Sequence, residues 1–306
     1  MKILITGAAG FIGSHLTDRL VRDGHQVIAV DDLSSGRRDN LPDQVSLHLL
    51  DIRTPELVQL IAAEKPRAVF HLAAQVDVRR SIDDPVHDLQ VNVEGTVRLA
   101  LACAAADVRR LIFASSGGAV YGDTVRVPTP EDEVTAPSSP YGCAKLAGEK
   151  YLEALARHRA MELTCLRYAN VYGPRQTGRG EAGVIGIFVR HLLAGEECII
   201  FGDGRQTRDF VYVSDVVDAN VLALESRTPG TYNVGTGVET TVNDVHALLA
   251  WQLAVKRPAV HQPAKSGEQV RSVLDCSRAQ RVLGWSPRIS IEEGLKATLD
   301  HARAGR

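Results

Sequence analysis

The stretch "ITGAAGFIGSHL", residues 5–16, decides the fold of this chain. Its glycines Gly7, Gly10 and Gly13 form the pattern G-x-x-G-x-x-G between an apolar strand-like run and a helical run. The first glycine allows a tight turn, the second lets the backbone approach a pyrophosphate, and the third lets helix and strand pack closely. The spacing therefore predicts the strand, turn and helix that bind a dinucleotide.

The start of the expected helix supplies the second part of this site. N–H groups in the first helical turn lack intrahelical partners, and they favour an anion. We expect the pyrophosphate to lie against the glycine turn and the first helical residues, namely Gly7, Gly10, Phe11, Ile12 and Gly13.

An acidic residue follows the next expected strand. Asp31, in "VIAVDDL", comes 18 residues after Gly13. A carboxylate there hydrogen-bonds the ribose hydroxyls of adenosine and repels a 2′-phosphate, so the sequence favours NAD over NADP. Asp32 is expected beside it at the ribose, whereas Arg37 and Arg38 leave a phosphate clamp as the alternative.

The first half of the chain alternates short apolar strands with helical patterns. Near-continuous apolar strands separated by helices are typical of a parallel sheet with both faces covered. Because such crossovers are right-handed, a doubly wound sheet is the main option. We expect strands near residues 2–6, 26–31, 45–50, 68–72, 110–115 and 162–168, and helices near 12–23, 54–63, 88–106 and 141–158.

The composition of the sequence changes after about residue 170. Gly and Pro become frequent, and the expected helices there are short. We therefore expect an α/β fold: a doubly wound parallel sheet (Rossmann domain, residues 1–170) with a smaller mixed α/β substrate lobe (residues 171–306), between which the chain interleaves. The short helices of this lobe are expected near residues 182–194, 214–225, 241–254 and 291–302.

Composition excludes several classes of function. Of 306 residues 24% are charged and 44% are hydrophobic, and the net charge of −2 lacks the basic surplus of a nucleic-acid-binding protein. No apolar run reaches the ~18 residues of a membrane span, and no signal peptide is expected. The five cysteines include no C-x-x-C pair, so we expect no metal, reduced thiols and a cytoplasmic location.

Further strand ends are expected to border the cofactor. The third strand ends at an acid that can meet the adenine edge, and the fourth ends in small residues that let a cofactor approach the backbone. A polar amide on the following, mostly apolar helix needs partners, and either ties strand loops together or supports the cofactor site. The residues concerned are Asp51, Ile52, Leu72, Ala73, Ala74 and Asn92.

Tyr141 and Lys145, in "YGCAK", are the expected catalytic pair. They lie four residues apart on an expected helix and therefore share one face. A free tyrosine has a pKa of ~10, which a nearby ammonium and a positive nicotinamide ring would lower. A tyrosine tuned in this way can take a proton from a sugar hydroxyl and return it later.

Motifs along nearly the whole chain resemble the extended short-chain dehydrogenase/reductase family, and within it the UDP-sugar 4-epimerases. They include "TGAAGFIG", "HLAA", "PYG..K", "RYANVYGPRQ" and "GDGRQTRDFVYVSDV". The resemblance implies that NAD stays bound and that Tyr141 removes the proton of the sugar C4 hydroxyl while hydride passes to NAD. The 4-keto sugar would turn over, and hydride would return to its other face. By the same resemblance, Tyr168 borders the nicotinamide.

The loop "ASSGGAVYG" departs from the family pattern. The family usually has Ser or Thr four residues before the tyrosine of "VYG", and here that position is Gly117. We expect Ser116 to bind the C4 hydroxyl instead, with Gly117 also at the substrate and Ser115 at the cofactor; serines that merely end a strand are the alternative. Related 4,6-dehydratases have Asp-Glu just after the hydroxyl residue, where this chain has "GA", so dehydration is not expected.

The second half of the chain is expected to hold a UDP-sugar. A guanidinium at Arg208 is suited to a diphosphate, which it binds as a fork. Arg179 suits a C6 carboxylate, so UDP-glucuronic acid is slightly favoured over UDP-glucose, with a solvent-facing arginine as the alternative. The substrate residues that the resemblance and this argument indicate are Asn170, Arg179, Gln206, Arg208, Lys265, Glu268 and Arg271.

Two other classes of function stay open. Another sugar-nucleotide oxidoreductase or a uronate decarboxylase would use the same site, and a non-catalytic sensor would bind NAD and a nucleotide without reaction. Family members often pair through two long helices, here near residues 88–106 and 141–158, so a homodimer is expected.

Overall fold

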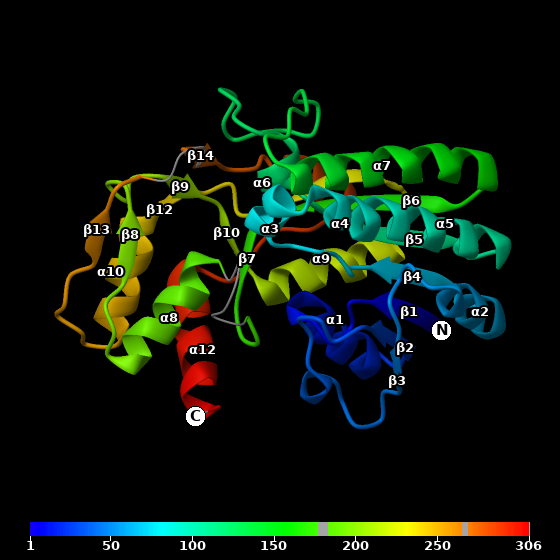
Figure 1. Ribbon diagram of the computed structural model, residues 1–306, viewed down its shortest axis with the longest axis horizontal. Coiled ribbons are helices and arrows are strands. Elements are labelled where there is room, and N and C mark those ends of the chain that lie inside the picture. The colour runs from blue at the N-terminus through cyan, green and yellow to red at the C-terminus, as the bar shows by residue number, and fades with distance from the viewer. Residues whose placement is uncertain (177–182, 265–268, 306) are drawn as a thin grey trace.

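The computed structural model describes residues 1–176, 183–264 and 269–305. Figure 1 shows a large sheet flanked by helices and, beside it, a smaller part made of short strands and helices. Among the described residues no helix is both long and apolar enough to cross a membrane.

A seven-stranded sheet forms the centre of the large part, in the order β11-β6-β5-β4-β1-β2-β3. All its neighbouring strands run parallel, which confirms the doubly wound sheet. The strand order reverses between β1 and β4, and ligands of such sheets bind in the crevice at the carboxyl ends of the strands there. The strands are β1 (Lys2–Thr6), β2 (Gln26–Asp31), β3 (Leu47–Leu49), β4 (Ala68–His71), β5 (Arg110–Ser116), β6 (Glu162–Tyr168) and β11 (Gly230–Val234).

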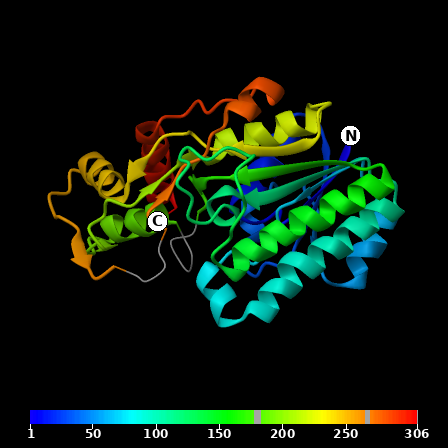
Figure 2. The same ribbon diagram turned by 90° about the horizontal axis from the view of Figure 1, so that it is seen from above.

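Helices cover both faces of this sheet, as Figure 2 shows from above. On one face lie α1 and α9, whose Leu16, Leu20 and Val216 share an apolar core with the strands. On the other face lie α2, α5 and α7, which share a second core. These helices are α1 (Phe11–Arg22), α2 (Pro55–Glu64), α5 (Thr96–Ala105), α7 (Pro140–Arg159) and α9 (Val213–Glu225).

The chain returns to the large sheet from its second half. Strand β11 pairs with β6 along Gly230 to Val234, and α9 packs against α1. A single boundary at residue 170 therefore does not describe the sheet, because residues 213–234 belong to it. The return of the chain has a physical reason, because β11 covers the edge of β6 that would otherwise be unpaired.

The smaller part is mixed α/β. Its core joins Tyr172, Phe188, Leu249 and Leu295 from different elements. Its sheets are β10-β7, β12-β9-β14 and β13-β8. The elements are β7 (Asn170–Tyr172), α8 (Val184–Ala194), β8 (Ile199–Phe201), β9 (Thr207–Arg208), β10 (Phe210–Tyr212), β12 (Thr240–Thr241), α10 (Val242–Gln252), β13 (Val260–Gln262), β14 (Arg271–Ser272), α11 (Ser277–Leu283) and α12 (Ile291–Ala304), of which α11 packs back on β11.

The helix expected over residues 88–106 is in fact divided into segments. It starts as α4 (Pro85–Leu89), continues as the π-helical turn η2 (Gln90–Gly95) and ends as α5. Single π-helical turns occur frequently at functional sites. Among the described residues, four further short helices lie outside the expected ranges, namely η1 (Arg38–Asn40), α3 (Val78–Asp83), α6 (Gly117–Val120) and α11.

Candidate active site

The glycine turn fits closely under the end of β4. Gly7 has a φ of 71°, and a Cβ there would lie 2.7 Å from the backbone nitrogen of Ala73. A Cβ on Gly13 would lie 2.0 Å from the carbonyl oxygen of Gly7. Glycine is therefore required at both positions. The N–H groups in the first turn of a helix such as α1 lack intrahelical partners, which fits a diphosphate at this turn.

Asp31 lies at the carboxyl end of β2 with 7% of its surface exposed. Its carboxylate accepts hydrogen bonds from the N–H groups of Ala9 (2.9 Å) and Leu33 (2.8 Å). Burial raises the pKa of Asp31, and these hydrogen bonds oppose the rise. An ionised carboxylate has about four acceptor sites, so the bonds leave capacity for ribose hydroxyls. Asp32, in contrast, is exposed and caps the turn at Ser34.

The two arginines of the alternative phosphate clamp are engaged elsewhere. Arg38 donates to the carbonyl oxygens of Leu41 (3.1 Å) and Val45 (3.2 Å). Arg37 lies 3.5 Å from the carboxylate of Asp39. The geometry therefore favours a ribose without a 2′-phosphate, in line with NAD.

The ends of β3 and β4 border the same crevice. Asp51 pairs with Arg53, which lowers the pKa of that carboxyl. Ile52 is buried, and a Cβ on Gly95 would lie 2.6 Å from its Cδ1. Leu72, Ala73 and Ala74 are half-buried and follow β4 beside the glycine turn.

Tyr141 and Lys145 occupy the first turns of α7. Ser139 caps this helix by accepting the N–H of Gly142 at 3.1 Å. The Nζ of Lys145 donates to the carbonyl oxygen of Ala114 at 2.9 Å and lies 5.9 Å from the centre of the Tyr141 ring. A hydrogen bond joins the side chains of Ser116 and Tyr141. The three expected catalytic side chains therefore meet at the ends of β5 and α7.

Burial dominates the titration of this pair. It raises the pKa of Tyr141 to about 12, although the hydrogen bond from Ser116 lowers it. It lowers the pKa of Lys145 to about 8, against the carboxylates of Asp88 and Glu149. In the protein without a bound cofactor, desolvation of the phenolate therefore keeps the Tyr141 phenol less acidic than a free tyrosine. The expected lowering of this pKa by Lys145 and the nicotinamide ring together stays a prediction.

The two serines of the loop point in opposite directions, as successive residues of a strand do. Ser116 faces Tyr141, whereas Ser115 donates its hydroxyl proton to Glu149. The expected contact of Ser115 with the cofactor therefore does not use this proton. At Gly117 a Cβ would lie 2.6 Å from Cδ1 of Leu274, so a side chain that follows β14 occupies the space that a residue larger than glycine would need.

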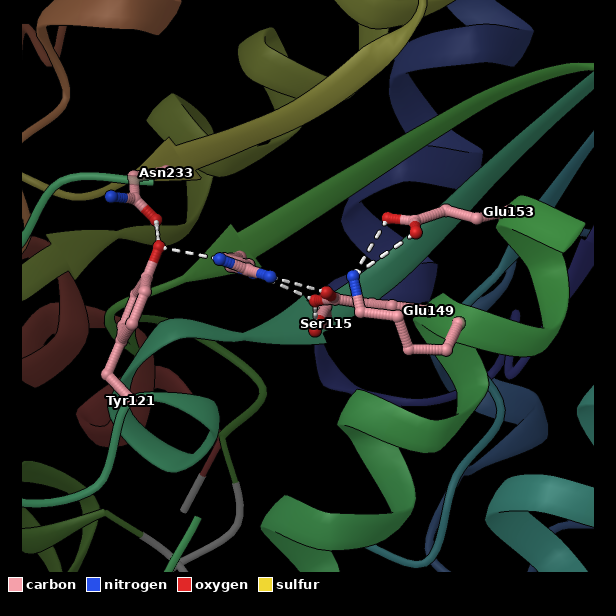
Figure 3. A network of polar contacts seen from close by, with 7 residues as sticks. Ser115, Tyr121, Glu149, Glu153 and Asn233 are labelled. Atoms are coloured by element: carbon pink, nitrogen blue, oxygen red, sulfur yellow. Dashed lines mark hydrogen bonds and ion pairs between the residues drawn. The ribbon is translucent and has the colours of Figure 1, made fainter. Parts of the chain in front are cut away.

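Behind Ser115 lies a set of buried side chains that we call the arginine-centred network: Ser115, Tyr121, Glu149, Arg167 and Asn233 (Figure 3). Arg167 donates two hydrogen bonds to Glu149, at 2.9 and 2.6 Å, and one to the Tyr121 hydroxyl at 2.8 Å. Tyr121 donates in turn to Asn233 at 2.8 Å. The network joins α7 to β5, β6 and β11.

On the other side of the pair lies the amide-centred network, made of Gln75, Asp88 and Asn92. Both amides donate to Oδ1 of Asp88, from Gln75 at 2.8 Å and from Asn92 at 2.9 Å. Asn92 also bonds the backbone N–H (2.9 Å) and carbonyl oxygen (2.8 Å) of Gln75. The Asn92 amide is therefore used to tie the loop after β4 to η2, the first of the two roles considered for it.

The expected sugar-nucleotide residues come from several short elements. Asn170 starts β7, half-exposed, next to Gly118, and the OH of Tyr168 donates to Asn220 at 3.0 Å. Strand β9 places Arg208 opposite Ser272 of β14, while Arg271 pairs with Glu239. Gln206 donates to the carbonyl oxygen of Phe201 at 3.0 Å. The remaining expected residues, Arg179, Lys265 and Glu268, lie outside the described residues.

Sequence reasoning missed several buried charged side chains. Glu149 was available from its spacing, because it lies four residues after Lys145 on the same helical face. Arg167, Asp88 and Gln75 gave no such local signal. Asp209, fully buried, binds the N–H and hydroxyl of Thr236 and the N–H groups of Gly237 and Leu274. Among the described residues no group of His, Cys, Asp and Glu is arranged to hold a metal.

Known proteins share this whole architecture. A UDP-glucose 4-epimerase of Mycolicibacterium smegmatis is 48% identical over an alignment of 309 residues that covers 99% of this chain and 99% of that protein. The crystal structure of Thermotoga maritima UDP-glucose 4-epimerase with UDP-glucose has 46% identity and a TM-score of 0.98, covering 100% of this chain and 99% of that one. The Thermus thermophilus UDP-glucose 4-epimerase in complex with NAD has 39% identity, a TM-score of 0.95 and full coverage of both chains.

These relatives are isomerases, which confirms the expected enzyme class. Residues 3–235 match the sequence pattern of the NAD dependent epimerase/dehydratase family, which includes the glycine turn and the Tyr141–Lys145 pair. The chain belongs to the NAD dependent epimerase/dehydratase family, and its cofactor is NAD.

Proposed function

We propose that this enzyme, an NAD-dependent 4-epimerase of UDP-sugars, interconverts UDP-glucose and UDP-galactose. One observation carries the proposal: Tyr141, Ser116 and Lys145 meet at the carboxyl end of β5, two strands from the glycine turn that follows β1. The named activity of relatives at 48% and 46% identity supports the choice of sugar.

In this proposal Tyr141 accepts the proton of the C4 hydroxyl and later returns it. Bound NAD supplies a hydride acceptor that becomes the donor, and its positive ring favours the phenolate. The hydrogen bond from Ser116 stabilises this phenolate. The Lys145 ammonium, 5.9 Å from the centre of the Tyr141 ring, would add a favourable charge. Because the proton and the hydride both return, the reaction inverts one centre with no net redox change.

The substrate would lie across the mouth of the sheet. We assign the diphosphate to Arg208 and Asn170, with Gln206 and Arg271 nearby, since guanidinium groups bind such anions as a fork. The slight preference for UDP-glucuronic acid rested on Arg179 alone, and the relatives compared do not support it. A neutral hexose is therefore the substrate we propose.

The test is incubation of the purified protein with UDP-glucose, UDP-N-acetylglucosamine and UDP-glucuronic acid, in parallel samples with and without added NAD. We expect NMR to show UDP-galactose from UDP-glucose, at a higher rate than any C4 epimer of the other two. Loss of carbon dioxide from the uronate, or release of reduced cofactor, would identify one of the alternative enzymes. No C4 epimer in any sample would overturn the proposal.

Tyr141→Phe tests the assignment of the base. The variant keeps the ring but loses the proton acceptor, so kcat should fall by about 10²–10⁴-fold. Tyr151→Phe is the matched control, because Tyr151 lies on the same helix with 53% of its surface exposed, and its kcat should not change. Full activity of Tyr141→Phe would remove Tyr141 from the mechanism.

We also propose that the enzyme is a cytoplasmic homodimer. Exposed apolar side chains gather on the outer helices of one face, with Ile82 on α3, Val86 and Leu89 on α4, Leu101 on α5 and Tyr151 on α7. Pairing of two copies would bury them. Light scattering should give twice the mass of the 33.1 kDa chain, and a monomer mass at micromolar concentration would contradict the pairing.

A further inference from the structure

Asp88 is a buried carboxylate whose charge is only partly satisfied by hydrogen bonds. It lies on α4 with 1% of its surface exposed. Both amides of its network donate to the same oxygen, Oδ1, from Gln75 and Asn92. Among the described residues no hydrogen bond reaches its second oxygen. A buried carboxylate held by neutral amides keeps its full charge, which acts on whatever lies next to it.

The neighbour that feels this charge is Lys145. Helix α4 packs against α7, which carries Lys145, and the attraction of Lys145 opposes the raised pKa of Asp88. Asp88 is likewise the larger of the two carboxylate influences that raise the pKa of Lys145. The half-exposed His87 acts on Asp88 from the same helix, more weakly than Lys145.

Three other titratable groups lie near Lys145, namely His71, Glu149 and Tyr141, and their charges are absent or already matched. His71 of β4 has its pKa lowered to about 3 by burial and is therefore neutral. Glu149, on α7 itself, is bound by the guanidinium of Arg167 from β6. Tyr141 carries no charge as long as it keeps its phenol proton. Asp88 is the one carboxylate near Lys145, within the described parts of the chain, that has no arginine of its own.

We propose that Asp88 is a positioning residue that keeps the Lys145 ammonium charged, and thereby sets the alkaline limit of the reaction. The inference rests on the proposed 4-epimerase function. Its physical basis is that burial alone favours a neutral lysine, while an opposite charge nearby favours the ammonium. Asp88 touches neither substrate nor cofactor in this role; it acts through Lys145.

Asp88 also affects the pKa of Tyr141. Its negative charge disfavours the phenolate and raises the pKa of Tyr141. Removing the charge would therefore lower the pKa of both groups. A lower pKa of Tyr141 alone would improve the base at neutral pH, whereas a lower pKa of Lys145 would move the loss of activity at high pH to a lower pH.

The experiment compares the pH profile of kcat/KM for UDP-glucose in the NAD-loaded wild type and in Asp88→Asn. Asparagine has the same shape, and its carbonyl oxygen can accept both amide hydrogen bonds. We expect the alkaline limb to move down by on the order of one pH unit, with activity near pH 6 within a few-fold of wild type. Asp88→Glu, which keeps the charge, should move the limb back toward its original position.

Asp84→Asn is the matched control. Asp84 precedes α4, is exposed and caps that helix by accepting the N–H of His87 at 3.0 Å, a role that asparagine also fills. The Asp84→Asn variant removes one negative charge from the same segment, and it should leave the alkaline limb of the pH profile in place.

An unmoved limb in folded Asp88→Asn, or an equal loss of rate at every pH, would overturn the proposal. If circular dichroism shows that this variant does not fold, the smaller uncharged Asp88→Ser gives the same readout. A wild type without epimerase activity would instead contradict the proposed function, so the two failures are distinguishable.

Discussion

Glu149 and Asp88 both act electrostatically on Lys145, the proposed catalytic lysine, and both are buried, with 0% and 1% of their surfaces exposed. Glu149 receives two hydrogen bonds from the guanidinium of Arg167. Asp88 receives only neutral amide donors. Two carboxylates of similar burial near one ammonium therefore have different electrostatic surroundings, one neutralised and one not.

The difference indicates a division of roles around α7. A carboxylate matched by a permanent cation acts mainly as a structural tie, here between β5, β6, β11 and the catalytic helix (Figure 3). A carboxylate bound by amides is also held in place, but it keeps an electrostatic influence on its neighbour. Variants that remove each charge should therefore affect stability in one case and titration in the other.

The largest effect is expected for Glu149→Gln. It leaves the Arg167 guanidinium buried, with 5% of its side chain exposed, and without its counter-charge. Breaking one side of a buried ion pair costs about 3–5 kcal/mol, so the free energy of unfolding in urea should fall by that amount. The comparison would be broken by a loss below about 1 kcal/mol.

Glu153→Gln is the control for that variant. Glu153 lies one helical turn further along α7 and pairs at 3.2 Å with Lys150, whose side chain is 59% exposed (Figure 3). Exposed pairs contribute little, so its free energy of unfolding should change by less than about 1 kcal/mol.

The sequence predicted those features of the candidate site that depend on local spacing. The glycine turn, Asp31 and the Tyr141–Lys145 pair were readable because each motif lies within one strand–helix unit. The burial of Glu149 was also implicit, since it repeats the four-residue spacing of the pair. These features need only the periodicity of a helix and a strand.

The remaining features of the site depend on which distant segments the fold brings together. Arg167 reaches Glu149 because β6 packs against α7, a contact that no local pattern states. Gly117 lacks a side chain because Leu274 fills its place, from a segment far along the chain. The return of β11 to the sheet and the pairing of Asp88 with Gln75 are of the same kind.

Tyr121→Phe is expected to have an intermediate effect on the free energy of unfolding, which sharpens the comparison. It removes the hydroxyl that accepts from Arg167 and donates to Asn233, and leaves both buried groups with one bond fewer. A buried group that loses its partner costs about 1–3 kcal/mol, less than the loss of a charge. A urea titration should place this variant between wild type and Glu149→Gln; a larger loss than in Glu149→Gln would contradict the ranking.

The smallest effect on stability is expected for Asp88→Asn. Burial raises the pKa of Asp88 in the folded protein. A carboxyl group with a raised folded pKa contributes stability below its unfolded pKa, and that contribution is lost as the pH rises through the folded pKa. At neutral pH the ionised Asp88 therefore costs free energy, and asparagine removes the cost while keeping the amide bonds.

Urea unfolding of Asp88→Asn at pH 7 should consequently give a free energy equal to that of wild type or higher by up to about 1 kcal/mol. The difference should shrink as the pH is lowered and the wild-type carboxyl takes up its proton. A loss comparable to that of Glu149→Gln would mean that Asp88 is a structural tie like Glu149. If the fold does not need Asp88 for its stability, the proposed effect of this carboxylate on Lys145 explains why it stays buried beside that lysine.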